Sequence, residues 1–131
     1  MPSVRRTSAA WRAASESNGS GQAPAADGEV RVMSPRDAYK ALQAGDTIVD
    51  GGNTRYHDDV RRAGEVKPKG LHYVDAGTSG GIWGLSEGYS LMVGGRQEAI
   101  DLLRPALETL APAVNRGWAH VGPSGAGHFT K

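Results

Sequence analysis

Residues 45–53 read Gly-Asp-Thr-Ile-Val-Asp-Gly-Gly-Asn, a short β-branched apolar run that ends at an acid and two glycines. The run 47–49 is typical of a buried strand, and the residues after it are those that turn a chain. Further strands are predicted at 71–75 and 90–93, and a last extended segment at 117–121. Helical patterns lie between these strands. The alternation predicts an α/β fold with βα units, a largely parallel sheet and flanking helices.

The helices are placed from their boundary signals and periodicity. A short helix is predicted from Ser34 to Ala44, and a polar surface helix at 55–66. Residues 96–110 carry apolar side chains on one helical face, which should pack on the sheet. A final helix is predicted to begin near Gly125. The side chains of the apolar face at 96–110 are Ile100, Leu103, Leu107 and Leu110.

The composition limits the possible classes of function. The chain of 131 residues suits one domain and has no apolar run that could span a membrane. Its net charge of +1 argues against the dense basic patch of a nucleic-acid-binding protein. The absence of cysteine excludes a disulfide scaffold and a thiolate nucleophile, and it fits a reducing, cytoplasmic setting. Residues 1–29 are expected to form a disordered Ala/Ser/Gly-rich tail before a folded region at 30–131.

Three glycine-rich segments each follow a predicted strand, at the carboxyl ends where α/β proteins bind ligands, and they are expected to converge at a common rim there. In the first, 51–54, the Asn53 amide can donate to and accept from a sugar hydroxyl, although this motif alone is more typical of a plain turn. The second, 78–81, belongs to a glycine-rich loop expected over 76–88. Its successive N–H groups beside a hydroxyl can bind an anion, and a flexible loop explains the pattern equally well.

A third segment, 122–131, places three glycines where a helix begins. Each costs about 1 kcal/mol in a helix interior, so a ligand or another element is expected to approach this backbone closely. His128 and Lys131 are three residues apart and share a helical face, which favours a site. Trp83 is interpreted as a loop anchor packed on the sheet. The His-Asp-Asp run at 57–59 is interpreted as solvated surface, because adjacent helical residues point apart, and no metal site is predicted.

Four motifs follow one another in a specific order: GDTIVDGGN at 45–53, GTSGGIWG at 77–84, GYSLMVGG at 88–95 and GAGHFTK at 125–131. Together they resemble decarboxylating 6-phosphogluconate dehydrogenase over about two thirds of the chain. Each motif alone is a weak signal, whereas their common order makes the resemblance specific. The wording of the second motif is more similar to the shorter, often NAD-preferring bacterial branch.

The resemblance implies a Rossmann-like NAD(P)-binding domain over 30–131 that ends at the start of the inter-domain helix. It implies oxidative decarboxylation of 6-phosphogluconate to ribulose 5-phosphate and CO2, with NAD or NADP as hydride acceptor. By motif match, Asn53 touches cofactor and substrate, and Lys131 accepts the C3 hydroxyl proton. A lysine base must be neutral, so its pKa must fall from about 10.4 toward 7 or 8 through burial. The remaining predicted substrate contacts are Ser79, Gly80, Gly81 and His128.

The sequence also departs from the family pattern. No Gly-x-Gly-x-x-Gly follows a predicted strand, so the cofactor phosphate site and the first strands are expected to be missing. The chain stops at Lys131, before the family's acid residue and helical domain, through which the full-length family forms homo-oligomers. We therefore expect the chain alone to be inactive, as a fragment of a working dehydrogenase. A non-catalytic anion-binding module and an unstable remnant are the alternatives. NAD and NADP are not distinguished.

Overall fold

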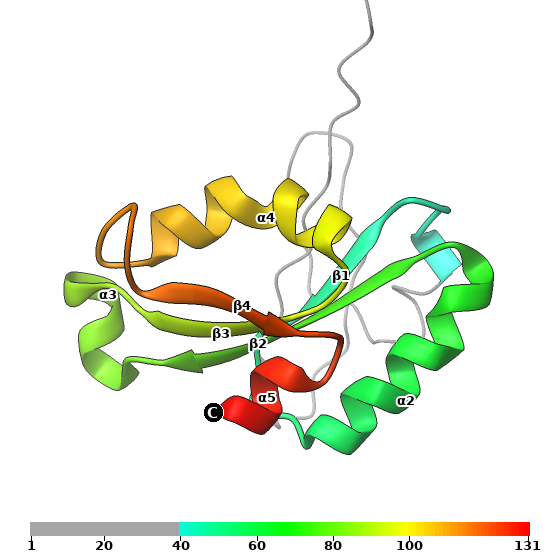
Figure 1. Cartoon of the computed structure of the whole chain (residues 1–131), viewed down its shortest axis with the longest axis horizontal. Helices are drawn as coiled ribbons and strands as arrows, with labels where there is room; N and C mark the ends of the chain where they lie inside the picture. The colour runs from blue at the N-terminus through cyan, green and yellow to red at the C-terminus, as the bar shows by residue number, and fades with distance from the viewer. Residues whose placement is uncertain (1–39) are drawn as a thin grey trace, which may run out of the picture.

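The computed structural model describes residues 40–131, and within them four strands form one sheet in the order β1-β2-β3-β4 (Figure 1). The predicted tail at 1–29 and most of the helix predicted from Ser34 lie outside the described residues. That helix ends at Ala41 rather than at Ala44. The reason is local, because the Asp46 carboxylate accepts the Gln43 N–H at 2.8 Å and replaces a helical carbonyl as its partner.

Two of the three strand pairings are parallel, in agreement with a largely parallel sheet. β1 (Thr47–Asp50) pairs in parallel with β2 (His72–Ser79), and β3 (Ser90–Gly94) pairs in parallel with β4 (Trp118–Gly122). The central pair β2 and β3 is antiparallel. The connection at 80–89 explains this, because a parallel crossover needs roughly a dozen residues or more.

Helices cover both faces of the sheet. α4 (Gln97–Leu110) lies on one face, and α2 (Tyr56–Val66) and α5 (Ala126–Thr130) lie on the other (Figure 1). The predicted apolar face of the 96–110 helix is confirmed, because it packs on the main core. That core comprises Val74, Ala76, Leu91, Val93, Ala99, Ile100, Leu103 and Leu107, with Leu110 partly buried beside it. Under α2, a smaller cluster joins Val66, Leu71 and Tyr73.

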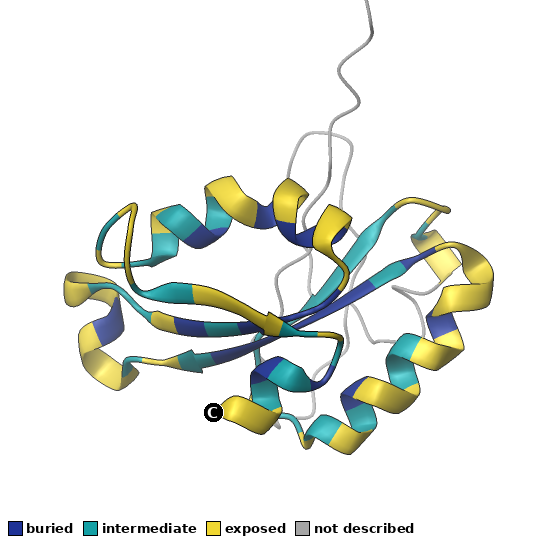
Figure 2. Ribbon diagram, viewed as in Figure 1, coloured by how far each residue is buried: buried dark blue, intermediate teal, exposed yellow. Residues whose placement is uncertain are grey.

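The prediction of a loop over 76–88 is wrong in part. β2 continues to Ser79, and two short helical segments follow, η2 (Gly81–Trp83) and α3 (Gly84–Glu87). Trp83 is 67% exposed, so it does not anchor this segment on the sheet. Most of η2 and α3 is exposed (Figure 2). The tryptophan that packs on the core is Trp118, and the Arg104 guanidinium lies over its ring at 5.3 Å.

Candidate functional site

One face of β2 gathers the predicted site residues against α5. The Asp75 carboxylate accepts the backbone N–H of Gly125 at 2.6 Å and that of His128 at 2.8 Å. A Cβ at Gly77 would lie 2.9 Å from the Lys131 Cβ, so only glycine admits α5 there. Side chains two apart on a strand share a face, so Ser79 also faces α5, about 7 Å beyond Gly77.

The residue at the end of α5, Lys131, forms a hydrogen bond with the loop after β1. Lys131 Nζ donates to Asn53 Oδ1 at 2.5 Å. Asp50 holds the loop, because its Oδ1 accepts the Gly52 N–H at 3.0 Å and its Oδ2 accepts the Thr54 hydroxyl at 2.8 Å. Asn53 and Lys131 are both exposed. Residues 40–131 therefore bring the two side chains together but do not shield them from water.

The convergence has a different origin from the one predicted. We expected three loops to meet at the carboxyl ends of parallel strands. Because β3 runs against β2, Asp50 and Gly94 are both in register with Asp75, in the middle of β2. The loop after β1 and helix α5 meet there. Gly80 and Gly81 lie farther along, at the turn out of β2, where Gly81 has a φ of 51°.

His128 lies inside the protein rather than at the exposed edge. Its side chain is 2% exposed. Nδ1 lies 2.6 Å from Asp59 Oδ2, and Nε2 lies 2.9 Å from the carbonyl oxygen of Gly52. Both ring nitrogens are therefore engaged within the protein, so the prediction that His128 contacts substrate directly does not agree with this geometry.

The interpretation of 57–59 as solvated surface is wrong for Asp59, which is fully buried. Its Oδ1 accepts the Tyr73 hydroxyl at 3.0 Å, while its other oxygen faces His128. His57 is exposed, and Asp58 makes only an exposed ion pair with Arg61. Adjacent side chains on α2 do point in different directions, as assumed, and the one that points into the protein is Asp59. A usable signal existed, since Asp59 lies seven residues before the buried Val66 and thus on the apolar face of α2.

Burial and charge shift three titratable groups in this interior. Burial raises the pKa of Tyr73 and of Asp75, and in Asp75 the two backbone hydrogen bonds oppose that rise. For His128, burial lowers the pKa. The hydrogen bond to Asp59 and the negative charges of Asp59, Asp50 and Asp75 outweigh burial, so the pKa of His128 is raised overall. The geometry thus favours an imidazolium.

Asp59, Asp75 and His128 each have a possible metal-ligand atom, and these atoms lie within 4.8 Å of one another. Each group already has partners in the protein. Both Asp75 oxygens accept backbone N–H groups, and both His128 nitrogens face oxygen acceptors. We therefore assign the cluster as a hydrogen-bond network.

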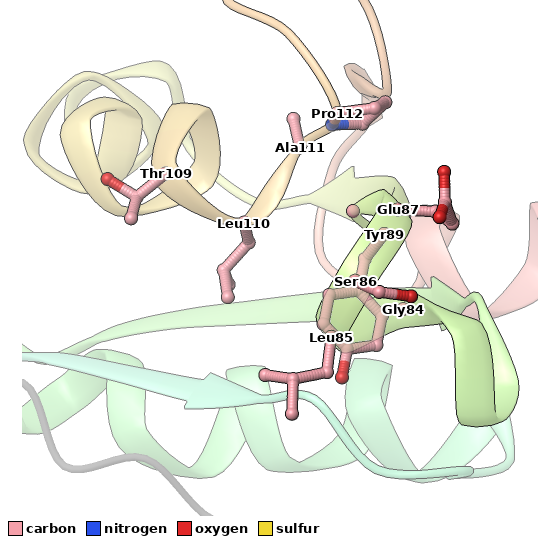
Figure 3. Close-up of a pocket in the computed structure, with 10 residues that line it drawn as sticks. Gly84, Leu85, Ser86, Glu87, Tyr89, Thr109, Leu110, Ala111 and Pro112 are labelled. Atoms are coloured by element: carbon pink, nitrogen blue, oxygen red, sulfur yellow. The ribbon is translucent and has the colours of Figure 1, made fainter.

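A surface hollow of about 430 Å³ lies elsewhere, between α3 and the carboxyl end of α4 (Figure 3). Its lining includes the exposed Leu85 and the ring of Tyr89, and none of the predicted site residues lines it.

None of the helices in the described region has the length and apolar character that crossing a membrane requires.

The raised pKa of His128 predicts how stability changes with pH. A histidine whose folded pKa exceeds its unfolded value stabilises the fold fully below about pH 6.5, and this contribution is lost as the pH rises through the folded value. The free energy of unfolding should therefore fall as the pH rises above about 6.5 in the wild type, and much less in His128→Gln. Urea unfolding followed by circular dichroism at several pH values measures it. Equal slopes in both proteins would contradict the prediction.

Comparison with known proteins identifies the family. A family model described as the NAD binding domain of 6-phosphogluconate dehydrogenase matches residues 23–120. The chain belongs to this family. The NAD(+)-dependent, decarboxylating 6-phosphogluconate dehydrogenase of Bacillus subtilis (strain 168) is 44% identical over 92 residues, which cover 69% of this chain and 20% of that protein. The NADP(+)-dependent enzyme of the same organism is 41% identical over 92 residues, with the same shares.

The solved structures agree. Plasmodium falciparum 6-phosphogluconate dehydrogenase, solved in its apo form and in complex with NADP+ and with 6-phosphogluconate, superposes with a TM-score of 0.66 at 33% identity. That match covers 72% of this chain and 21% of the other. The 6-phosphogluconate dehydrogenase resemblance, the Rossmann-like α/β fold and NAD or NADP as the family's cofactor are thereby confirmed. This chain spans between a fifth and a third of the length of the curated relatives first matched. Similar identities to the two Bacillus enzymes do not separate NAD from NADP.

Proposed function

We propose that the chain supplies the reacting edge of a 6-phosphogluconate dehydrogenase, which converts 6-phosphogluconate to ribulose 5-phosphate and CO2. The observation that carries this proposal is the contact of Lys131 Nζ with Asn53 Oδ1 at 2.5 Å. It joins an amine that can take a proton to an amide that can orient a hydroxyl, beside the strand end that carries Ser79. These groups come from three motifs far apart in the sequence.

The proposed roles follow from the chemistry of each group. When neutral, Lys131 accepts the proton of the C3 hydroxyl as hydride leaves C3, and its ammonium form then stabilises the oxygen of the keto and enediolate states. Asn53 orients the same hydroxyl, because its amide can donate and accept. Ser79, Gly80 and Gly81 hold the substrate's carboxylate and hydroxyl oxygens through N–H and hydroxyl donors.

A bound dinucleotide would accept the hydride, and the described residues fit only one end of it. Asn53 is exposed beside Lys131, where the amide can hold a nicotinamide ribose hydroxyl. The amino end of α5 is filled by the Asp75 carboxylate, which takes two backbone N–H groups and repels phosphate. We therefore place the nicotinamide end here and assign no pyrophosphate contact to residues 40–131.

Substrate binding tests the proposal. Addition of 6-phosphogluconate to the 15N-labelled chain should shift the amide signals of Asn53, Gly80 and Gly81. Lys131→Gln should raise the dissociation constant about tenfold or more, because a hydrogen bond to a charged group contributes about 1.5–3 kcal/mol. Lys67→Gln, which removes an equal charge at the far end of α2, is the matched control. Equal affinity of the two variants would contradict the role of Lys131.

The chain of residues 1–131 by itself is expected to show no turnover. Lys131 is exposed, and no cofactor phosphate motif follows a strand in residues 40–131. With 6-phosphogluconate and NAD+ or NADP+, absorbance at 340 nm should stay at the level of a heat-killed control. A rise above that control would overturn this expectation.

Binding without turnover is also what a non-catalytic anion-binding module would show. If Lys131→Gln lost binding of 6-phosphogluconate but kept binding of sulfate, that result would argue against this alternative. Homo-oligomerisation and a cytoplasmic location stay predictions.

A further inference from the structure

The His128 ring is held between two groups that accept hydrogen bonds. Nε2 faces the carbonyl oxygen of Gly52 at 2.9 Å, and a carbonyl has no proton to give, so Nε2 carries one. Nδ1 faces a carboxylate oxygen of Asp59 at 2.6 Å, a short contact in the direction expected of a charge-assisted hydrogen bond, which is shorter than a neutral one. The ring thus has acceptors at both nitrogens.

The surroundings favour a proton at both nitrogens. Asp59 is fully buried, and a buried carboxylate without a cationic partner is strongly destabilising. Among residues 40–131, its second oxygen faces the neutral Tyr73 hydroxyl, whose single proton is shared with Asp50 Oδ2 at 3.1 Å, so His128 is the cation that faces Asp59. The titratable and charged groups around the ring are Asp59 from α2, Asp50 at the end of β1, Tyr73 and Asp75 from β2, Arg62 through its ion pair with Asp50, and Lys131 on the same helix.

Through Gly52, the ring also controls the next residue, Asn53. The Gly52 N–H is tied to Asp50 at 3.0 Å, and its carbonyl is tied to His128 at 2.9 Å. Lys131 follows His128 by three residues, about one helical turn. The ring and Asp50 together therefore hold the residue that precedes Asn53, opposite the end of the helix at which Lys131 lies.

We propose that His128 is a positioning residue, a doubly protonated imidazolium that clamps the Gly52 carbonyl to Asp59 and so holds Asn53 opposite Lys131. Its meaning for catalysis rests on the proposed function. The clamp itself does not, because it consists of contacts within the chain. A neutral ring would keep the contact to Gly52 but would leave Asp59 buried without a countercharge.

Nuclear magnetic resonance of the full chain labelled with 15N-histidine tests the clamp. At pH 8, above the ordinary histidine pKa of about 6.5, His128 should still show two ring N–H signals with similar nitrogen shifts. The exposed His57 supplies reference shifts at each pH, and the His128→Gln variant assigns the signals. A single protonated nitrogen on His128 at pH 8 would overturn the proposal.

Two isosteric variants on one helix test the positioning. Asp59→Asn should release the second proton of His128 at pH 8 and abolish the nuclear Overhauser contact between the Lys131 side chain and the Asn53 amide. Asp58→Asn, its exposed neighbour, should change neither. Persistence of the contact in folded Asp59→Asn would overturn the positioning role. Should that variant not fold, raising the pH of the wild type until His128 loses its second proton gives the same comparison.

These readouts use no substrate. If the chain did not bind 6-phosphogluconate but His128 were doubly protonated, the proposed function would be wrong and the clamp would stand. If the chain bound 6-phosphogluconate but His128 were neutral, the clamp would be wrong and the proposed function would stand.

Discussion

Gly127→Ala is expected to destabilise the chain by about 3 kcal/mol or more, at the upper end for overpacking, and so to leave α5 undocked. A Cβ at this position would lie 2.4 Å from the carbonyl oxygen of Met92 and 2.7 Å from that of Asp75. Both are backbone atoms of paired strands, so neither can move aside as a flexible side chain would. Since α5 carries Lys131, the contact with Asn53 should be lost as well.

Gly64→Ala is the matched control for this substitution. Gly64 is also a helical glycine, on the exposed side of α2, and a Cβ there meets nothing within 4 Å. The change should stabilise the helix by up to about 1 kcal/mol, because alanine has the higher helix propensity. Thermal unfolding followed by circular dichroism compares the two, at roughly 4–8 °C per kcal/mol for a domain of this size. Equal melting temperatures would contradict the packing of α5 described here.

Asp75→Ala is expected to cost about 3 kcal/mol, because two buried N–H groups lose a charged acceptor. The carboxylate holds the Gly125 N–H at 2.6 Å and the His128 N–H at 2.8 Å, and its side chain is fully buried. α5 should therefore detach from β2. Asp75→Asn should be milder, since its amide keeps one acceptor oxygen.

Denaturant unfolding measures the loss, with Asp101→Ala as the control. Asp101 is an exposed acid on α4 that pairs with Arg104 at 3.3 Å, so its removal should cost less than about 1 kcal/mol. If the two alanine variants were equally stable, the buried carboxylate would not be what holds α5 on the sheet.

Local patterns in the sequence were sufficient for most of the elements. The β-branched run before Asp50 became β1, and the apolar stripe with Ile100 and Leu103 became the buried face of α4. The ordered motifs also indicated the family, and in two of them a glycine lies where a Cβ would clash with another segment, Gly77 beneath α5 and Gly127 within it.

Other features depended on which strands become neighbours. The short connection at 80–89 makes β2 and β3 antiparallel. Neither the hydrophobic periodicity of a segment nor its strand propensity indicates the direction of its neighbour. The inward direction of Asp59 follows from its place on α2, but burial of its carboxylate depends on a partner sixty-nine residues away, His128, whose Nδ1 lies 2.6 Å from it.

The amino-acid sequence by itself determined the segments, the motifs and the family, because these depend on near neighbours along the chain. Only the tertiary structure decided that His128 lies inside while Lys131 lies outside, although they share a helix. The physical reason is that a charged group is buried only where other segments supply partners for it. The His128 ring contacts the Asp59 carboxylate and the Gly52 carbonyl in the interior, whereas the Lys131 amine contacts the exposed Asn53 amide.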